Sequence, residues 1–152
     1  FMAEIYGMES ADGANGIEKQ IDQFGLSDFI DQMAESYSHG MKQRLVFASA
    51  LLHRPCVLIV DEPMVGLDPR SMRLVKDILR EETRQGTTVF MSTHTLAVAE
   101  EIADRIGVIT NGHLLFLGTV ADLRARMSSD ESLEQLFLAL TEEEVGDAVG
   151  QR

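Results

Sequence analysis

The stretch YSHGMKQRLVFASALLHRPCVLIVDEPMVGLDP, residues 37–69, contains the features that decide the fold. A loop of small residues leads into a helical pattern, and a proline separates that pattern from the apolar run 57–60. A short apolar run between two prolines is typical of a buried strand in a parallel sheet. Asp61 and Glu62 follow it directly. Because ionised groups are costly to bury, carboxylates at this position indicate a functional site.

The residues after this stretch predict alternating helices and strands. Asp68 followed by Pro69 is typical of a helix start, with aspartate as the N-cap. The succession of strand, helix and strand indicates an α/β fold with a parallel sheet. The further elements expected are a helix to about residue 85, a buried strand over 87–92, a helix over about 95–103, a hairpin turning at Asn111-Gly112, and two helices that begin at the capping boxes Thr119/Asp122 and Ser132/Gln135.

The first 55 residues show only helical patterns. Helices are expected over 1–10, about 16–35 and 41–53, with a turn in ESADGANG at 9–16. The chain begins Phe1-Met2 inside such a pattern, which suggests a piece of a longer protein or an extra residue before an initiator methionine. Three segments are therefore expected: a helical subdomain over 1–55, a partial α/β core over 56–127, and a C-terminal helix with an acidic tail over 128–152.

Composition excludes several classes of protein. The 152 residues suit one domain with a hydrophobic core. The net charge of -12 lies at the ends, with -7 over 1–36 and -6 over 128–152 against +1 between them. No basic face for nucleic acid is visible, and solvated helix faces explain the acidic ends. The sequence shows no secretory signal or apolar run of about 18 residues that would span a membrane. The single cysteine, Cys56, is expected to be buried and reduced, as in the cytosol.

Polar residues end both predicted strands of the core. One strand runs into Asp61-Glu62 and the other into Ser92-Thr93-His94. Ligands bind beyond the carboxyl ends of parallel strands, so neighbouring strands would bring both carboxylates and the histidine into one crevice. One carboxylate suits Mg²⁺ coordinated to phosphate, the second can orient or deprotonate a water, and the histidine can contact a terminal phosphate.

Each motif also has a purely structural alternative. The run 61–63 can form an ordinary turn, and His94 alone can cap a helix. Residues 38–40 precede a helix N-terminus, where backbone N–H groups and the helix dipole suit an anion, but a serine N-cap explains the same pattern. The combination of motifs at this spacing favours a site.

In combination, these motifs resemble the C-terminal two-thirds of an ABC-transporter nucleotide-binding domain. Residues 37–41 are similar to the signature loop, and 56–62 to the Walker B strand with its catalytic glutamate. Residues 66–69 resemble the D-loop, and 92–94 the switch histidine. The resemblance covers essentially the whole chain. It implies a truncated, P-loop NTPase-like (RecA-like) parallel sheet core with an N-terminal helical subdomain and a C-terminal β-hairpin plus helices.

The resemblance implies a role for each matching residue. Asp61 would hold Mg²⁺ through water, and Glu62 would polarise the attacking water. His94 would contact the γ-phosphate of ATP, and Asp68 would couple two sites across a dimer. The signature loop comprises Tyr37, Ser38, His39, Gly40 and Met41. Residues 38–41 of this loop would bind the nucleotide, with Ser38 and Gly40 contacting the γ-phosphate of ATP held by the other subunit.

The resemblance further implies an ATP-hydrolysing subunit that powers membrane transport through a head-to-tail dimer. Residues 5–7, 38–45 and 132–141 are most similar to ABC-2-type exporters. The implied partners are a transmembrane permease subunit and a second nucleotide-binding subunit, and the implied location is cytoplasmic, at the inner face of the cell membrane. The alternatives are a non-catalytic interaction module and a chromosome-maintenance-type ABC ATPase head, which needs coiled-coil arms that are not visible.

The sequence departs from the family pattern in three respects. No phosphate-binding GxxxxGK[ST] occurs, so the chain alone is expected to bind ATP weakly or not at all and not to hydrolyse it. Without the strand that carries this loop, an apolar edge beside 87–92 is expected, which would invite pairing in a non-native dimer. His39 and Met41 stand where the family usually has glycine and glutamine, and Met64-Val65 replace a small polar pair.

Overall fold

The computed structural model describes residues 1–127 and 133–138. The chain divides into two compact units, Phe1–Ser92 and Thr93–Arg152, which are described separately. The first contains α1 (Met2–Ile5), α2 (Ser10–Phe24), a 3₁₀ turn (Ala34–Ser36), α3 (His39–Leu51), β1 (Val57–Asp61), α4 (Pro69–Arg84) and β2 (Thr88–Ser92). The second contains α5 (Leu96–Ile102), β3 (Ile106–Thr110), β4 (His113–Gly118), α6 (Val120–Met127) and a helical segment at 133–138.

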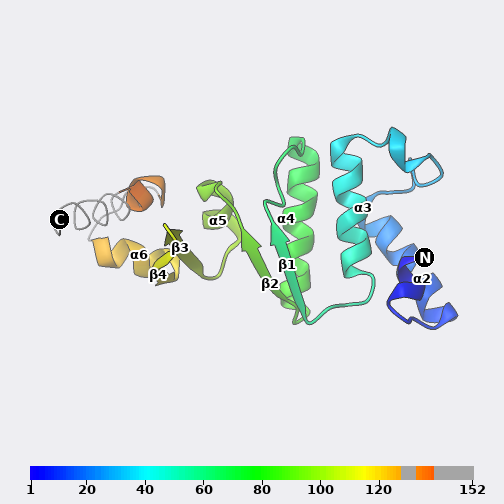
Figure 1. The fold of residues 1–152 in the computed structure, drawn as a ribbon, viewed down its shortest axis with the longest axis horizontal. Coiled ribbons are helices and arrows are strands. Elements are labelled where there is room, and N and C mark those ends of the chain that lie inside the picture. The colour runs from blue at the N-terminus through cyan, green and yellow to red at the C-terminus, as the bar shows by residue number, and fades with distance from the viewer. Residues whose placement is uncertain (128–132, 139–152) are drawn as a thin grey trace. The chain divides into compact units, whose positions relative to one another are not determined.

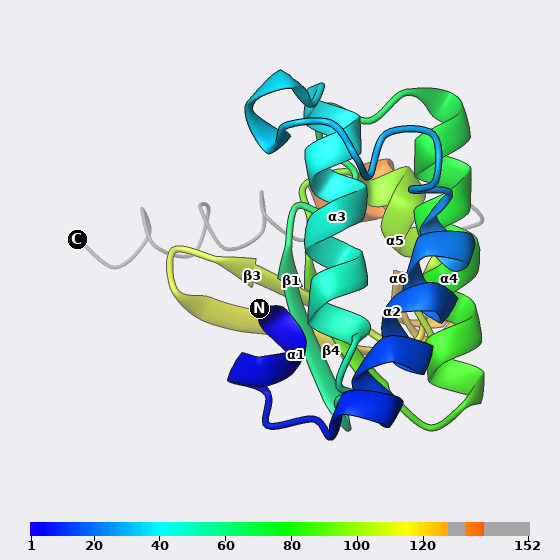
Figure 2. The ribbon, with the colours of Figure 1, turned by 90° about the vertical axis from the view of Figure 1, so that its right-hand side faces the viewer.

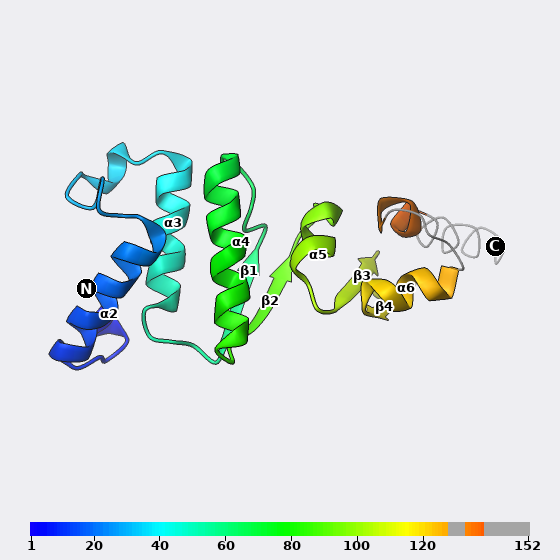
Figure 3. The same ribbon diagram turned by 180° about the vertical axis from the view of Figure 1, so that it is seen from behind.

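The sheet of the first unit pairs the two strands that carry the predicted site. β1 and β2 run parallel, from Val57 opposite Thr88 to Asp61 opposite Ser92. The prediction that these strands are neighbours is therefore confirmed. Helix α4 packs against β2, and α3 packs against α4 (Figures 1 and 3). Both strands point their carboxyl ends in the same direction, as a ligand site at that edge requires.

The sheet is buried on one face only, which corrects the expectation of fully buried strands. Leu58 is buried on the face that α4 covers. Ile59 and its register partner Phe90, on the opposite face, are 75% and 64% exposed. The apolar run predicted burial on both sides, but the described part of this unit supplies a covering helix to only one. Cys56, expected to be buried, is exposed, and it lies just before β1 rather than within the sheet.

Helix α2 begins earlier and ends earlier than its sequence predicts. The predicted turn at 9–16 is wrong, because α2 already begins at Ser10. Its glycines serve packing: a Cβ at Gly13 would lie 3.3 Å from the Ala3 Cβ, and one at Gly16 3.2 Å from the Leu52 Cδ1. The helix ends at Gly25, whose φ of 57° is left-handed. Residues after it form turns rather than the predicted helical continuation.

An aromatic core joins α2, α3 and the segment between them. The Phe24 and Phe47 rings stack at 6.4 Å, and the Arg44 guanidinium lies 5.0 Å from the Phe29 ring centroid. Tyr37 is buried against Phe29 edge to face, and its hydroxyl donates to the Phe29 carbonyl at 2.9 Å. Figure 2 shows α3 from its outer side, with α2 beside it. This packing fixes the segment that leads into the signature-like loop.

The second unit is built on the predicted hairpin. β3 and β4 pair antiparallel, and the turn residues Asn111 and Gly112 have φ values of 47° and 80°, as a two-residue hairpin turn of the mirror type requires. The capping box at the start of α6 is also confirmed. The Thr119 N–H donates to the Asp122 carboxylate at 2.9 Å, and the Asp122 N–H donates to the Thr119 hydroxyl at 3.0 Å. The box expected at Ser132 lies outside the described residues.

Within residues 1–127 and 133–138, no helix combines the length and apolar character needed to cross a membrane.

The core of the second unit should depend on Leu123, which is fully buried with Phe116, Leu133 and Leu136. Leu123→Ala should lower the free energy of unfolding of this unit by about 2–5 kcal/mol, because it leaves a cavity. The measurement is urea unfolding followed by circular dichroism. Leu117→Ala is the matched control, since Leu117 is 58% exposed on β4 and its truncation should cost far less. Equal losses for both variants would contradict the assigned core.

The start of α4 should make stability depend on pH. Hydrogen bonds from the Ser71 hydroxyl and from the Ser71 and Arg70 N–H groups lower the pKa of Asp68. This stabilisation is full above the unfolded pKa of about 3.9 and is lost as the pH falls through the lower folded pKa.

Asp68→Asn keeps a capping oxygen but does not titrate. Between pH 7 and pH 2, the thermal unfolding midpoint should therefore fall further in the wild type than in Asp68→Asn. Parallel declines of the two proteins would contradict this assignment.

Candidate functional site

The carboxyl ends of β1 and β2 are tied together by side-chain and backbone hydrogen bonds. The Ser92 hydroxyl donates to the Asp61 carboxylate. The Glu62 N–H donates to the Ser92 carbonyl at 3.0 Å. The Asp61 carboxylate and the backbone of Glu62 are thus fixed at one edge of the sheet. Ser92 was expected only as part of the motif 92–94, with no role of its own. Its position at the end of a strand that neighbours β1 is the feature that could have indicated its hydrogen bond to Asp61.

Glu62 has an unusual backbone conformation. Its φ of 46° lies in the left-handed region, which residues with a Cβ adopt at a cost of about 1–3 kcal/mol. Its side chain is half-buried, and its carbonyl accepts a hydrogen bond from the Val65 N–H at 3.2 Å. A left-handed residue directly after a strand turns the chain sharply, and the Val65 N–H closes that turn. Such strain is concentrated at functional sites.

The predicted histidine lies in the second unit. His94 is exposed, two residues beyond the end of β2. Next to it, the Thr95 N–H donates to the Thr93 hydroxyl at 3.0 Å, which shapes the turn before α5. The convergence of His94 with the two carboxylates stays a prediction.

The signature-like loop forms the N-terminus of α3. Ser38 is the N-cap, and its hydroxyl accepts a hydrogen bond from the Met41 N–H at 3.3 Å. The serine N-cap considered as an alternative is therefore present. Ser38 and His39 are exposed, and Gly40 and Met41 are half-buried. A capped, accessible helix N-terminus with an adjacent glycine still offers N–H groups to a phosphate.

The signature-like and D-loop-like segments lie against each other within the chain. A Cβ built on Gly40 would lie 3.8 Å from the Asp68 carboxylate and from the Ser71 hydroxyl. Asp68 itself is exposed, and its carboxylate accepts from the Arg70 N–H at 3.0 Å, the Ser71 N–H at 3.1 Å and the Ser71 hydroxyl at 2.6 Å. Three donors thus hold this side chain at the start of α4.

The carboxylate pair fits a magnesium ion that a nucleotide completes. Among the described residues, no group of three or more His, Cys, Asp or Glu side chains is arranged to hold a metal. Mg²⁺ needs fewer, since it is usually bound through one or two carboxylates, several waters and substrate phosphates. Asp61 and Glu62, at the end of β1, are suited to that mode of binding.

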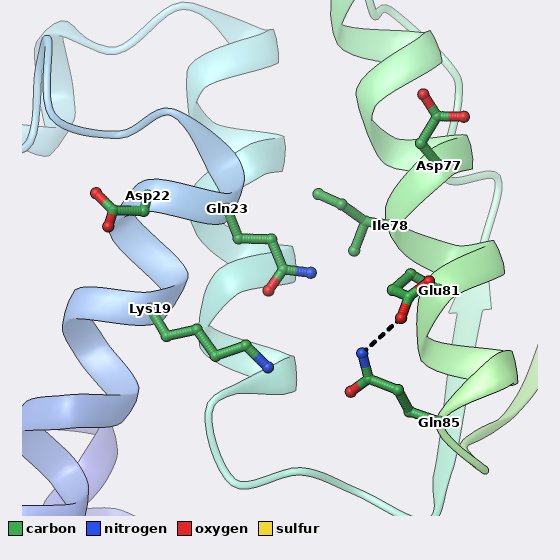
Figure 4. Close-up of a pocket in the computed structure, with 7 residues that line it drawn as sticks. All are labelled: Lys19, Asp22, Gln23, Asp77, Ile78, Glu81 and Gln85. Carbon is green, nitrogen blue, oxygen red and sulfur yellow. Dashed lines mark hydrogen bonds between the residues drawn. The ribbon is translucent and has the colours of Figure 1, made fainter.

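A cleft between α2 and α4 is separate from these residues. It measures about 590 Å³ and is lined by Lys19, Asp22, Gln23, Asp77, Ile78, Glu81 and Gln85 (Figure 4). The Gln85 amide donates to the Glu81 carboxylate at 2.9 Å across its wall. None of its lining residues belongs to the predicted site. The side chains of Gln23 and Lys19 extend from α2 toward α4, so Gln23 lines this cleft rather than the edge that holds Asp61 (Figure 4).

Comparison with known proteins places these features in one family. The family described as "ABC transporter" matches residues 4–65. The daunorubicin/doxorubicin resistance ATP-binding protein of Streptomyces peucetius is 39% identical over 85% of this chain and 39% of its own length. The bacitracin transport ATP-binding protein of Enterococcus faecalis is 41% identical over 74% of this chain and 37% of its own length.

A solved structure supports the same assignment. An ATP-binding subunit of an ABC transporter superposes with a TM-score of 0.84 at 30% identity, over 92% of this chain and 59% of that chain. The chain thus spans between 37% and 59% of the length of these relatives. This match over 92% of the chain confirms the expected P-loop NTPase-like fold class. With its strand-end carboxylates and capped signature-like loop, the chain belongs to the ATP-binding proteins of ABC transporters.

Proposed function

We propose that this chain supplies the metal-holding and water-activating groups of an ATP-hydrolysing site in an ABC transporter. The observation that carries the proposal is the pair of carboxylates at the end of β1, tied to the end of β2 through Ser92. In this proposal, Asp61 orients a water ligand of Mg²⁺, and Glu62 accepts a proton from the attacking water. The ion supplies charge neutralisation at the β- and γ-phosphates.

Hydrolysis by this arrangement requires little covalent chemistry from the protein. Phosphoryl transfer depends on positioning and on stabilising the charge of the transferred group. The hydrogen bond from Ser92 holds the Asp61 carboxylate, and backbone hydrogen bonds to Ser92 and Val65 hold the main chain of Glu62, which supports the positioning requirement. His94 is proposed to contact the γ-phosphate.

The proposal extends to a head-to-tail dimer. The N–H groups at the start of α3, with Ser38 and Gly40, would bind the γ-phosphate of ATP held by a second subunit. Asp68, beside Gly40 in the same chain, would couple the two sites. The further proposed partner is a transmembrane permease subunit, and the proposed location is the cytoplasmic face of the membrane. The names of the relatives support export of antibiotic-like compounds.

The arrangement of the chain within such a subunit is also a proposal. Residues 1–55 would form the helical subdomain, 56–127 part of the α/β core, and 128–152 the closing helix and tail. In the described part of the first unit, β1 and β2 form a two-stranded sheet. Pairing of another chain with the free side of β2 in a non-native dimer is proposed on that ground.

Glu62→Gln tests the water-activating role in the full-length protein. ATP turnover should fall by about 10²–10³, the loss typical of removing one preorganised group, while ATP binding is retained. Phosphate release at saturating ATP is the measurement. Glu81→Gln on α4 makes the same chemical change at an exposed site, and this control should hydrolyse ATP normally. Normal turnover in Glu62→Gln would refute the assignment.

Residues 1–152 alone should bind ATP weakly and should not hydrolyse it, since they contain no GxxxxGK[ST] to surround the phosphates. Isothermal titration calorimetry with Mg²⁺ and ATP is the direct measurement. A dissociation constant in the micromolar range, or measurable phosphate release, would show that this chain holds the nucleotide by other means.

A further inference from the structure

The first turns of α3 hold the turn that follows Glu62. His39 Nε2 lies 3.2 Å from the carbonyl oxygen of Val65, although the two residues are 26 positions apart. A carbonyl oxygen can only accept, so the imidazole donates from Nε2. The usual family residue at this position, glycine, has no side chain to make this hydrogen bond.

A second donor from the same helix face reaches the same turn. The Gln43 amide Nε2 donates to the Pro63 carbonyl at 3.4 Å. His39 and Gln43 are four residues apart, so they lie one above the other on α3. Two side chains of one helix thus bind two carbonyls of one turn.

The imidazole also packs directly on the turn. Gly66 has a φ of 73°, and a Cβ built there would lie 2.7 Å from His39 Cδ2 and 3.0 Å from His39 Nε2. Pro63 and Met64, the first two residues of the turn, are buried. The segment 63–66 is therefore held from both sides, by burial and by α3.

The turn fixed in this way begins at the strained Glu62, whose carbonyl closes it by accepting from the Val65 N–H at 3.2 Å. We infer that His39 and Gln43 are positioning residues, which hold the 63–66 turn and thereby keep Glu62 in its left-handed conformation. The inference rests on the proposed function, in which Glu62 activates water. It assigns the His39 ring to a contact within its own chain, rather than to the phosphate of a neighbouring subunit.

Hydrogen exchange of residues 62–67 tests the contact without any need for activity. Loss of one hydrogen bond of about 1 kcal/mol in His39→Ala should speed exchange of these amides about threefold to tenfold. His39→Gln should restore protection, because its amide nitrogen lies about as far from the backbone as Nε2 of the imidazole. His53→Ala is the matched control, since His53 stacks on Tyr6 at 4.0 Å, beyond the other end of α3. Unchanged exchange in His39→Ala would overturn the inference.

A combined substitution tests the packing. Gly66→Ala should speed exchange of the turn less in the His39→Ala background than in the wild type, because the ring that its Cβ would meet is gone. Equal effects in both backgrounds would show that the ring does not pack on the turn.

Kinetics of the full-length protein separate positioning from phosphate contact. His39→Ala and Gln43→Glu should lower kcat for ATP hydrolysis with little change in KM, because they disturb Glu62 and not the nucleotide. A raised KM with normal kcat would assign His39 to phosphate binding and overturn the inference. If the wild type does not hydrolyse ATP, the proposed function fails, while hydrogen exchange still decides whether α3 holds the turn.

Discussion

The parallel pairing of β1 with β2 is the constraint on which the candidate site depends. It places Asp61 opposite Ser92, so that a hydroxyl, a carboxylate and the next backbone amide meet at one edge. One strand alone would leave the side-chain and backbone torsions at its end free to rotate. Hydrogen bonds to the neighbouring strand restrict them. The sharp turn at Glu62 then starts from a fixed point. Phosphoryl transfer depends on the positions of the surrounding groups more than on reactive side chains, so it needs groups that are held rigidly.

Local signals in the sequence predicted most of the elements. The Asp68-Pro69 pair marks a helix start, and Asn111-Gly112 marks a hairpin, because both act through their own backbone and near neighbours. Features that depend on distant partners could not be predicted in this way. The glycines of α2 suggested a turn, yet Gly16 lies within the helix, where the absence of a side chain lets Leu52 approach closely. The exposed face of β1 likewise depends on which layers are present, and an apolar run does not carry that information.

The site residues show the same difference between local sequence signals and contacts with distant residues. Motif spacing predicted Asp61 and Glu62, and the structure shows the hydrogen bonds that hold the Asp61 carboxylate and the Glu62 backbone. The contact of His39 with Val65 joins residues far apart in the chain, so no periodicity or spacing could indicate it. The left-handed backbone of Glu62 was equally hidden, since nothing in the sequence around it demands a positive φ. Side chains that hold a site are harder to find from sequence than those that form it.

The carboxylate of Asp68 already receives three donors from the first turn of α4. In the proposed dimer, the same group would also face a neighbouring subunit. The same carboxylate oxygens would then serve both the start of the helix and the contact between subunits. A change in that contact would therefore strengthen or weaken the hydrogen bonds of the first turn of α4. A genetic screen of substitutions at this position would therefore not distinguish a loss of folded protein from a loss of cooperativity between the two sites. Measurements on purified protein would separate the two effects.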